Sequence, residues 1–192
     1  ITRVVPVGTI SAAQRRDFTL VLQGMMALSR AHFPRGTRSP MLDAIARAPL
    51  WAAGVDYGHG TGHGVGYFMN VHEGPQVISP SAAPDPHTAM EPGMITSIEP
   101  GIYKPGRWGI RIENLVLNVP AAVGDSAGEF GEFLRFETLT LCPIDTRCLA
   151  MELLQPHEVT WLNDYHAQVR ARLLPHVGGA ARAWLELRTE AI

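Results

Sequence analysis

The chain has 192 residues, with 16 Lys and Arg, 18 Asp and Glu, and a formal net charge of −2. This balance excludes an electrostatic basis for binding nucleic acid or a membrane surface, and no apolar run approaches the roughly 20 residues of a membrane-spanning helix. Hydrophobic residues make up 46% and charged residues 18% of the chain, so it has enough apolar material for a packed core and is not a disordered polymer.

The N-terminal elements are a strand followed by a helix. Residues 2–7 are mostly apolar and predict a strand. Ser11 and Gln14 have the spacing of a capping box, in which each side chain bonds a free backbone N–H group at the start of a helix. Apolar residues at helical spacing follow, and residues 34–36, Pro-Arg-Gly, are predicted to end the helix.

A second helix is predicted from its capping residues. Ser39 is the expected N-cap and Pro40 the first helical residue. Pro49 is expected to break this helix, because proline lacks the N–H group that a helix interior needs. Gly54 then closes the unit.

The rest of the chain contains strands first and helices last. Residues 94–98, 110–119 and 133–141 predict strands separated by Gly and Pro. A helical region starts at residue 155 and has an apolar face up to residue 174, and a shorter helix contains Trp184 and Leu187. Helices early, an antiparallel sheet in the middle and helices at the end predict an α+β fold.

Two cysteines, Cys142 and Cys148, stand close together in one segment. Their spacing matches neither a zinc site nor a disulfide framework, so we interpret them as free thiols. Free thiols are typical of a reducing compartment, which predicts a cytoplasmic location.

The segment of residues 58–66 combines two histidines with a glycine-rich backbone. His59 and His63 stand four residues apart, and glycines separate them. Glycine permits unusual backbone angles and close approach of other groups, which suits a site where a ligand touches the main chain. A surface turn with two incidental histidines is the alternative interpretation.

Further histidine and acidic residues follow this segment. His72 is a third imidazole, which taken alone is as well explained as a surface residue. Glu99 and Glu113 lie in apolar, strand-like segments, and strand periodicity places Arg111 on the same face as Glu113. A buried carboxylate must be paired, hydrogen-bonded or bound to a metal. An Arg111–Glu113 ion pair on a solvent-exposed edge strand is the alternative.

Imidazole nitrogen and carboxylate oxygen, without thiolates, suit divalent ions such as Mn²⁺ or Zn²⁺. Two such ions can activate a shared water molecule and bind both the attacking and the leaving group. The histidines and glutamates together therefore favour metal-assisted hydrolysis.

These motifs resemble, over nearly the whole chain, the Xaa-Pro aminopeptidases of metallopeptidase family M24, and in particular its longer, multi-domain subgroup. The resemblance implies the C-terminal part of a catalytic domain with the pita-bread fold, incomplete at its N-terminus, with a curved antiparallel sheet and flanking helices. It assigns residues 1–142 to that domain and residues 143–192 to a C-terminal helical extension. The motifs that carry it are 58–66 (GHGTGHGVG), 70–75 (NVHEGP), 99–101 (EPG), 111–114 (RIEN), 136–140 (FETLT) and 161–166 (WLNDYH).

The resemblance also implies a role for each site residue in holding the metals. His63, Glu99 and Glu113 would be metal ligands, Glu113 bridging the two ions and Glu99 moving a proton to or from the attacking water. Arg111 would orient these acidic ligands. The implied cofactors are two divalent ions, with Mn²⁺ as the commonest assignment and Zn²⁺ or Co²⁺ as alternatives.

The implied reaction is hydrolysis of the bond between an N-terminal residue and a following proline, by a hydroxide that bridges the metals. His72 would lie near the scissile carbonyl and His59 near the bound dipeptide end. The implied substrates are peptides with proline at the second position, and the full-length protein is expected to be a homodimer.

The chain departs from the family pattern in one respect. The family has two further aspartate ligands, one of them directly before a segment resembling residues 1–3, and neither is present here. We therefore expect that the chain belongs to a longer protein and that it is inactive alone. Alternatives are a prolidase-type dipeptidase, a non-catalytic pita-bread module that binds peptides, and a globular domain whose His and Glu residues are structural.

Overall fold

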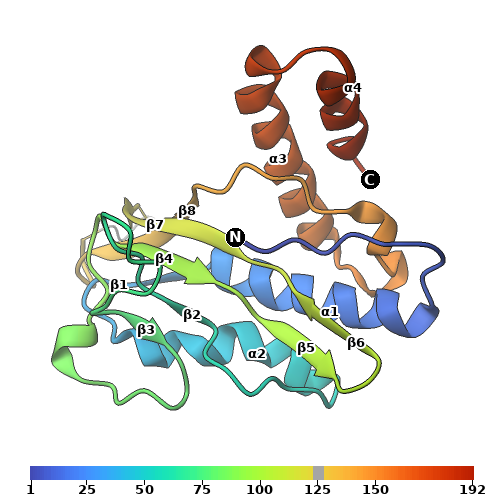
Figure 1. Cartoon of the computed structure of the whole chain (residues 1–192). Coiled ribbons are helices and arrows are strands. Elements are labelled where there is room, and N and C mark those ends of the chain that lie inside the picture. Colours follow the sequence, from blue (N-terminus) through green and yellow to red (C-terminus); the bar gives the residue numbers. More distant parts are fainter. Residues whose placement is uncertain (123–127) are drawn as a thin grey trace.

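The computed structural model describes residues 1–122 and 128–192, and within them helices combine with antiparallel sheets. This confirms the predicted α+β class. The helices α1 and α2 pack against each other beside the strands, while α3 and α4 project away from them (Figure 1). The helices are α1 (Ala12–Ser29), α2 (Asp43–Ala52), α3 (Pro156–Leu173) and α4 (Gly179–Arg188). The strands are β1 (His32–Pro34), β2 (Gly62–His63), β3 (Val77–Ile78), β4 (Ile95–Ile98), β5 (Gly101–Lys104), β6 (Trp108–Arg111), β7 (Asn114–Ala121) and β8 (Phe133–Thr138).

Helix α1 begins as predicted, with Ser11 and Gln14 forming a complete capping box. Its apolar face is fully buried and forms the centre of the hydrophobic core. The helix ends at Ser29, so the prediction that residues 34–36 end it was wrong. The short strand β1 lies between the helix and that turn and pairs with β8.

Helix α2 differs from its prediction at its start and at Pro49, whereas Gly54, at positive φ directly after the C-cap Ala53, closes it as predicted. Ser39 and Pro40 start a short 3-10 turn (Ser39–Leu42), and the α-helix follows from Asp43. Pro49 lies inside the helix and does not break it, which corrects the prediction. Gly24 of α1 lies close to α2, since a Cβ atom added to it would approach the carbonyl oxygen of Ala46 to 2.5 Å. This close helix contact holds α2 together despite its proline.

The sheet shows two further corrections. Residues 2–7 form no strand, and only Thr2 makes a bridge, to Glu113. The predicted strand 110–119 is two strands, because β6 pairs with β5 whereas β7 pairs with β4 and β8. The main sheet has the order β1-β8-β7-β4, and β2-β3 and β5-β6 are separate two-stranded hairpins. The strand predicted at 133–141 ends at Thr138.

The pairing of β4 with β7 positions the two glutamates. Ile98 lies opposite Asn114 in the antiparallel register. Glu99 follows Ile98 and Glu113 precedes Asn114, so the two acids occupy opposite positions just beyond the end of the ladder. The sheet thus brings together two carboxylates that are 14 positions apart in the sequence.

The C-terminal helices agree with the sequence prediction. Gln155 and Glu158 form a capping box at the start of α3, whose Leu162 and Val169 are fully buried. Helix α4 contains Trp184 and Leu187, both largely exposed. None of the helices over the described residues combines the length and the apolar character that crossing a membrane requires.

Candidate functional site

A buried polar network holds the glycine-rich segment in place. Arg47 of α2 is only 2% exposed, and its guanidinium donates hydrogen bonds to the carbonyl oxygens of Tyr57 (2.7 Å) and His59 (2.6 Å). Its charge is balanced by Asp43, one helical turn away. Asp43 also accepts a hydrogen bond of 2.7 Å from the hydroxyl of Thr61, which is fully buried. Helix α2 therefore fixes the backbone on both sides of His59.

Glycines bring this segment against β4. A Cβ atom at Gly62 would lie 1.9 Å from the carbonyl oxygen of Ser97, and one at Gly64 would lie 2.0 Å from that of Glu73. No side chain fits at either position. Glycine is therefore required at both positions by lack of space, whatever the backbone angles. The N–H of His63, between the two glycines, donates a hydrogen bond of 3.0 Å to Ser97 Oγ.

The imidazole of His63 points at Glu99. His63 Nε2 lies 3.2 Å from Glu99 Oε1, and both side chains are about five-sixths buried, with 17% and 16% exposed. His63 Nδ1 lies 2.8 Å from the carbonyl oxygen of Gly64, so a proton on Nδ1 leaves Nε2 free to act as a base or a ligand. Ser97 donates a hydrogen bond of 3.1 Å to the same oxygen of Glu99.

This contact shifts the pKa of both partners. The hydrogen bond to Glu99 raises the pKa of His63, against the opposing effect of burial. Burial by itself raises the pKa of Glu99, but hydrogen bonds from His63 and Ser97 outweigh it and lower that pKa overall. Each group therefore stabilises the charged form of the other.

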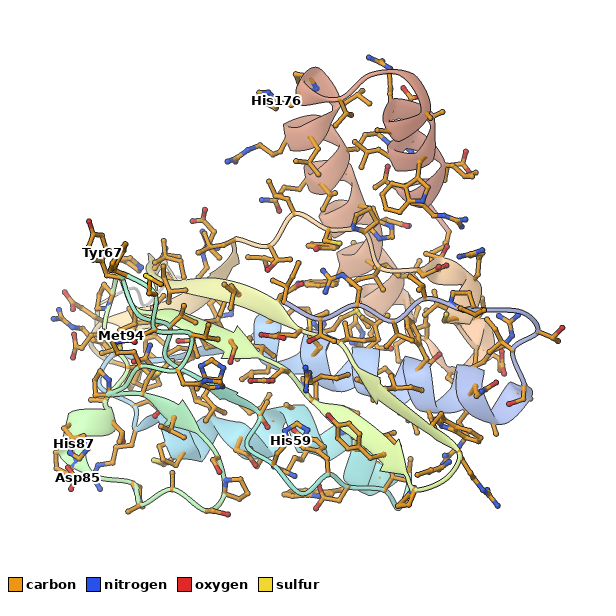
Figure 2. All side chains as sticks on the ribbon, viewed as in Figure 1. His59, Tyr67, Asp85, His87, Met94 and His176 are labelled. Atoms are coloured by element: carbon orange, nitrogen blue, oxygen red, sulfur yellow. The ribbon has the colours of Figure 1, made fainter. Side chains whose placement is uncertain are left out.

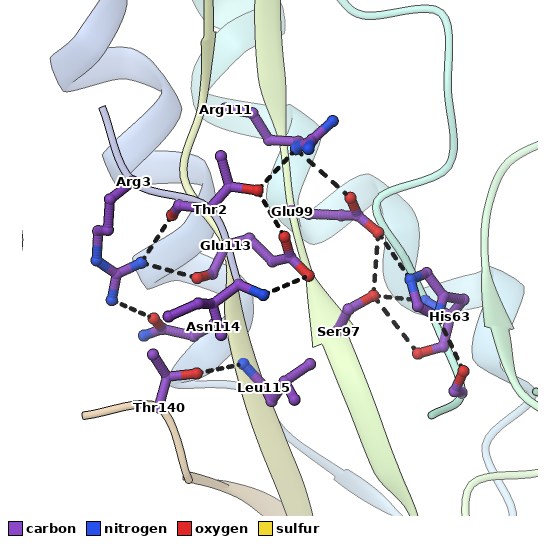
Figure 3. Close-up of polar contacts among 12 residues, drawn as sticks. Thr2, Arg3, His63, Ser97, Glu99, Arg111, Glu113, Asn114, Leu115 and Thr140 are labelled. Atoms are coloured by element: carbon purple, nitrogen blue, oxygen red, sulfur yellow. Dashed lines mark hydrogen bonds and ion pairs between the residues drawn. The ribbon is translucent and has the colours of Figure 1, made fainter. Parts of the chain in front are cut away.

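Glu113 lies beside this pair and is connected to it through Thr2 and Arg111 (Figure 3). Thr2 Oγ1 donates a hydrogen bond of 2.7 Å to Glu113 Oε2. Arg111 Nε lies 3.0 Å from Thr2 Oγ1 and 3.8 Å from Glu99 Oε2. Arg111 thus contacts the Glu99 carboxylate directly and reaches Glu113 only through the Thr2 hydroxyl, so the alternative of a direct Arg111–Glu113 ion pair is not what the structure shows.

His59 and His72 lie at the edges of the same site. His59 Nε2 is hydrogen-bonded to the hydroxyl of Tyr103 at 2.8 Å, which places His59 beside β5 (Figure 2). The ring of His72 lies 4.2 Å, between centroids, from that of His63. Both histidines border an open hollow of about 460 Å³, which is lined by His59, Gly60, Gly62, His63, His72, Val77, Ser79, Glu99 and Arg111.

Five of the six residues predicted from the sequence therefore line one hollow, and the sixth, Glu113, is connected to Arg111 of the lining through the Thr2 hydroxyl. Sequence reasoning missed Thr2, Ser97 and Tyr103, whose hydroxyl groups connect the others. The sequence predicts a strand for residues 2–7, so nothing in it marks Thr2 as a residue of the site. Tyr103 lies in β5, a strand that the sequence did not predict, so it carried no signal either.

The donor chemistry of His63, Glu99 and Glu113 fits a divalent cation, because all three offer imidazole nitrogen or carboxylate oxygen. Their arrangement is partial. Over residues 1–122 and 128–192, no three His, Cys, Asp or Glu side chains surround a common point. Two of the donors contact each other, and the third is turned toward Thr2.

Comparison with known proteins extends these observations. The family model for metallopeptidase family M24 matches residues 1–119, and that for the C-terminal region of peptidase M24 matches residues 132–192. Aminopeptidase P1 of Lotus japonicus is 43% identical over 100% of this chain and 29% of its own length.

Solved structures show the same relationship. X-prolyl aminopeptidase from Caenorhabditis elegans, described as a cytosolic enzyme with a di-nuclear active site, has a TM-score of 0.91 and 38% identity. The match covers 99% of this chain and 31% of that one. Prolidase from Pyrococcus furiosus has a TM-score of 0.53 and 36% identity over 60% of this chain and 32% of its own.

The chain therefore spans about a third of the length of the relatives that it matches. Its fold is the pita-bread fold of these peptidases, as the sequence motifs predicted. The two family models together cover the segments that carry the site and both C-terminal helices. This chain belongs to metallopeptidase family M24.

Proposed function

We propose that the protein carrying this chain is a metal-dependent aminopeptidase that hydrolyses the bond between an N-terminal residue and a following proline. The observation that carries the proposal is the contact of His63 with Glu99 in a hollow that His59 and His72 also border. Similarity to aminopeptidase P and X-prolyl aminopeptidase over nearly the whole chain supports the substrate class.

In this proposal His63, Glu99 and Glu113 hold part of a pair of divalent ions, with Mn²⁺ as the preferred metal. When bound, such ions lower the pKa of water and polarise the peptide carbonyl. The Glu99 carboxylate, held by Ser97 and Arg111, accepts and returns the proton of the attacking water. The Arg111 guanidinium keeps that carboxylate ionised and oriented.

The substrate occupies the hollow between the histidines. His72, next to the His63 ring, is proposed to contact the scissile carbonyl, and His59 the end of the bound dipeptide. The hydroxyl of Tyr103 holds the His59 ring in place. Similarity to aminopeptidase P over nearly the whole chain supports an aminopeptidase over a strict dipeptidase.

Three further statements belong to this proposal. The resemblance implies five ligands and these residues supply three, so we propose that the 192 residues alone do not cleave such peptides. The free thiols of Cys142 and Cys148, together with the cytosolic relative, favour a cytoplasmic location. The full-length protein is proposed to be a homodimer.

The test is a peptide panel with the full-length protein and added Mn²⁺. The substrates are an Xaa-Pro dipeptide, an Xaa-Pro-Xaa tripeptide and the matching Xaa-Ala-Xaa tripeptide, compared for wild type, Glu99→Gln and the exposed control Glu137→Gln. We expect cleavage of the Xaa-Pro tripeptide by wild type and by Glu137→Gln, and a loss of about 10³-fold in Glu99→Gln, since it removes both a ligand and a proton carrier.

Each other result identifies an alternative. Cleavage of the dipeptide alone would indicate a prolidase and reject the aminopeptidase. Peptide binding without cleavage, and without bound metal on elemental analysis, would indicate a non-catalytic module. Equal rates for Pro and Ala at the second position would refute the proposed specificity.

A further inference from the structure

Arg3 connects the strand next to the site with the C-terminal helices, and its contacts on the strand side come first (Figure 3). Its Nη1 donates hydrogen bonds to the carbonyl oxygens of Thr2 (2.9 Å) and Glu113 (2.7 Å). Its Nη2 donates to Asn114 Oδ1 at 2.6 Å. One guanidinium thus fixes the backbone of Glu113 and the side chain that follows it.

The other side of the same guanidinium contacts the C-terminal region, residues 132–192. Arg3 Nη2 donates to the hydroxyl of Tyr165 at 2.7 Å and to the carbonyl oxygen of Cys142 at 2.9 Å. Its Nε lies 3.2 Å from the carbonyl oxygen of Pro143. Tyr165 is on α3, so a helix far along the chain is hydrogen-bonded to the residue that holds Glu113.

The hydroxyl of Tyr165 is a buried hub for these contacts. The side chain is 4% exposed and stacks on Trp161, with ring centroids 5.4 Å apart and planes 5° apart. Its hydroxyl lies 2.7 Å from the carbonyl oxygen of Cys142 and 3.1 Å from that of Thr140. Burial raises the pKa of Tyr165, so its hydroxyl keeps its proton and both accepts from Arg3 and donates to a carbonyl.

These contacts lead directly to a carboxylate of the site. The carbonyl oxygen of Thr2 that Arg3 holds also accepts the N–H of Glu113 at 3.1 Å. The Thr2 hydroxyl in turn donates to Glu113 Oε2. The direction of the Glu113 carboxylate therefore depends on Thr2, and the position of Thr2 depends on Arg3.

We propose that the C-terminal region positions Glu113 for metal binding, through the hydrogen bonds of the Tyr165 hydroxyl to Arg3 and of Arg3 to Thr2 and Glu113. Arg3 and Tyr165 are positioning residues, since neither lines the hollow. The inference deepens the proposed function, on which its metal readout depends. It also gives the C-terminal helices a role in the site instead of mere attachment to the domain.

The opposing explanation is that this junction only holds α3 on the domain. Tyr165→Phe separates the two, because it removes one hydroxyl and keeps the ring and its stacking. Trp161→Phe is the matched control, since it weakens the packing of the same helix and keeps the hydroxyl. Wild type and both variants are prepared as the full-length protein, first without metal.

Two measurements are made on each. Hydrogen exchange of the Glu113 amide, without metal, reports the Thr2–Glu113 bridge directly, and calorimetric titration with Mn²⁺ reports the affinity of the site. For Tyr165→Phe we expect about fivefold faster exchange, as for loss of a hydrogen bond worth about 1 kcal/mol. We expect about tenfold weaker Mn²⁺ binding, as for other residues that orient metal ligands. Trp161→Phe is expected to lower stability and to change neither value.

The positioning role would be rejected if the exchange rate of the Glu113 amide were unchanged in Tyr165→Phe, or if it changed equally in both variants. Failure of the proposed function looks different. In that case wild type itself binds no Mn²⁺ and cleaves no Xaa-Pro peptide, whereas the exchange difference between the two variants still decides whether the C-terminal region holds Glu113.

Discussion

Replacing Gly62 by alanine is the most direct test of how the site is built. A Cβ atom at Gly62 would stand 1.9 Å from the carbonyl oxygen of Ser97, whereas ordinary contact begins at 3.4 Å. The obstacle is backbone of β4, which cannot turn away as a flexible side chain would. The two segments must therefore separate by about 1.5 Å, the difference between these two distances.

The cost of that separation can be worked out from the contacts that span it. Forcing extra volume into a packed site costs about 1–3 kcal/mol. The hydrogen bonds from His63 N–H to Ser97 Oγ and from Glu99 N–H to the carbonyl oxygen of Thr61 both cross the same gap. Weakening them adds up to about 1 kcal/mol each. We expect Gly62→Ala to lose about 3 kcal/mol of unfolding free energy.

The matched control is Gly58→Ala in the same motif. Gly58 has no heavy atom within 4 Å of its added Cβ, so the change is expected to stay within about 0.5 kcal/mol. Both are measured by urea unfolding followed by tryptophan fluorescence, and by peptidase activity. A shift of about 1 Å in a catalytic group lowers activity about 10²-fold, so Gly62→Ala should also be nearly inactive. Equal stability of the two variants would refute the close-approach argument.

Three other predictions follow from single contacts. Burial and two nearby guanidinium groups lower the pKa of His166 to about 4, below the unfolded value of about 6.5. The unfolding free energy should therefore fall by roughly 3 kcal/mol as the pH drops from above 6.5 to about 4. The variant His166→Gln keeps a hydrogen-bond acceptor and cannot titrate, so it should flatten that part of the pH profile of urea unfolding. Arg47→Met leaves buried Asp43 unpaired and should cost about 3–5 kcal/mol in the same assay, whereas Arg182→Met, in an exposed ion pair, should cost less than about 1 kcal/mol. Mn²⁺ at 1,000 times its Kd should raise the unfolding free energy by about 4 kcal/mol, and Glu113→Gln should remove most of that gain; an equal gain in both proteins would exclude Glu113 as a ligand.

Local signals in the sequence predicted the helices well. The capping pair Ser11–Gln14 acts within one turn, so neighbouring residues suffice to identify it, and the last helical region was likewise placed from residue 155 onward. Pro49 misled the prediction for the opposite reason. The helix around it is held by packing against α1, which no local pattern contains.

The strands needed information that the local pattern lacks. Apolar and polar residues alternate well enough over residues 110–119 to predict one strand. The chain nevertheless changes pairing partners at Ile112 and Glu113, between the end of β6 and the start of β7. Partner choice depends on β4, β5 and β8, which lie elsewhere in the sequence. The apolar segment 2–7 likewise pairs only through the bridge from Thr2 to Glu113, the residue directly before β7.

For the site, the sequence motifs identified the charged and aromatic residues, and the hydroxyl residues that connect them were missed. His63 and Glu99 stand out because imidazoles and acids are unusual in glycine-rich and apolar surroundings. Thr2 and Ser97 are ordinary residues for a strand. Their importance depends on a distance of about 3 Å to a carboxylate, which only the folded chain creates.

The location of the site follows from how the sheet ends. Along β4 and β7 the backbone groups pair with each other, and the ladder stops at Ile98 and Asn114. Glu99 follows this ladder and Glu113 precedes it, and their backbone N–H groups bond the carbonyl oxygens of Thr61 and Thr2 instead of each other's strand. A carboxylate there cannot be left without partners, and side chains supply them: Ser97 and Arg111 to Glu99, and Thr2 to Glu113. Because strand side chains alternate between faces, a slip of β7 by one residue against β4 would turn Glu113 to the opposite face and leave Glu99 in place. The same ladder that stabilises the sheet therefore determines whether the two glutamates lie on one face, at opposite positions.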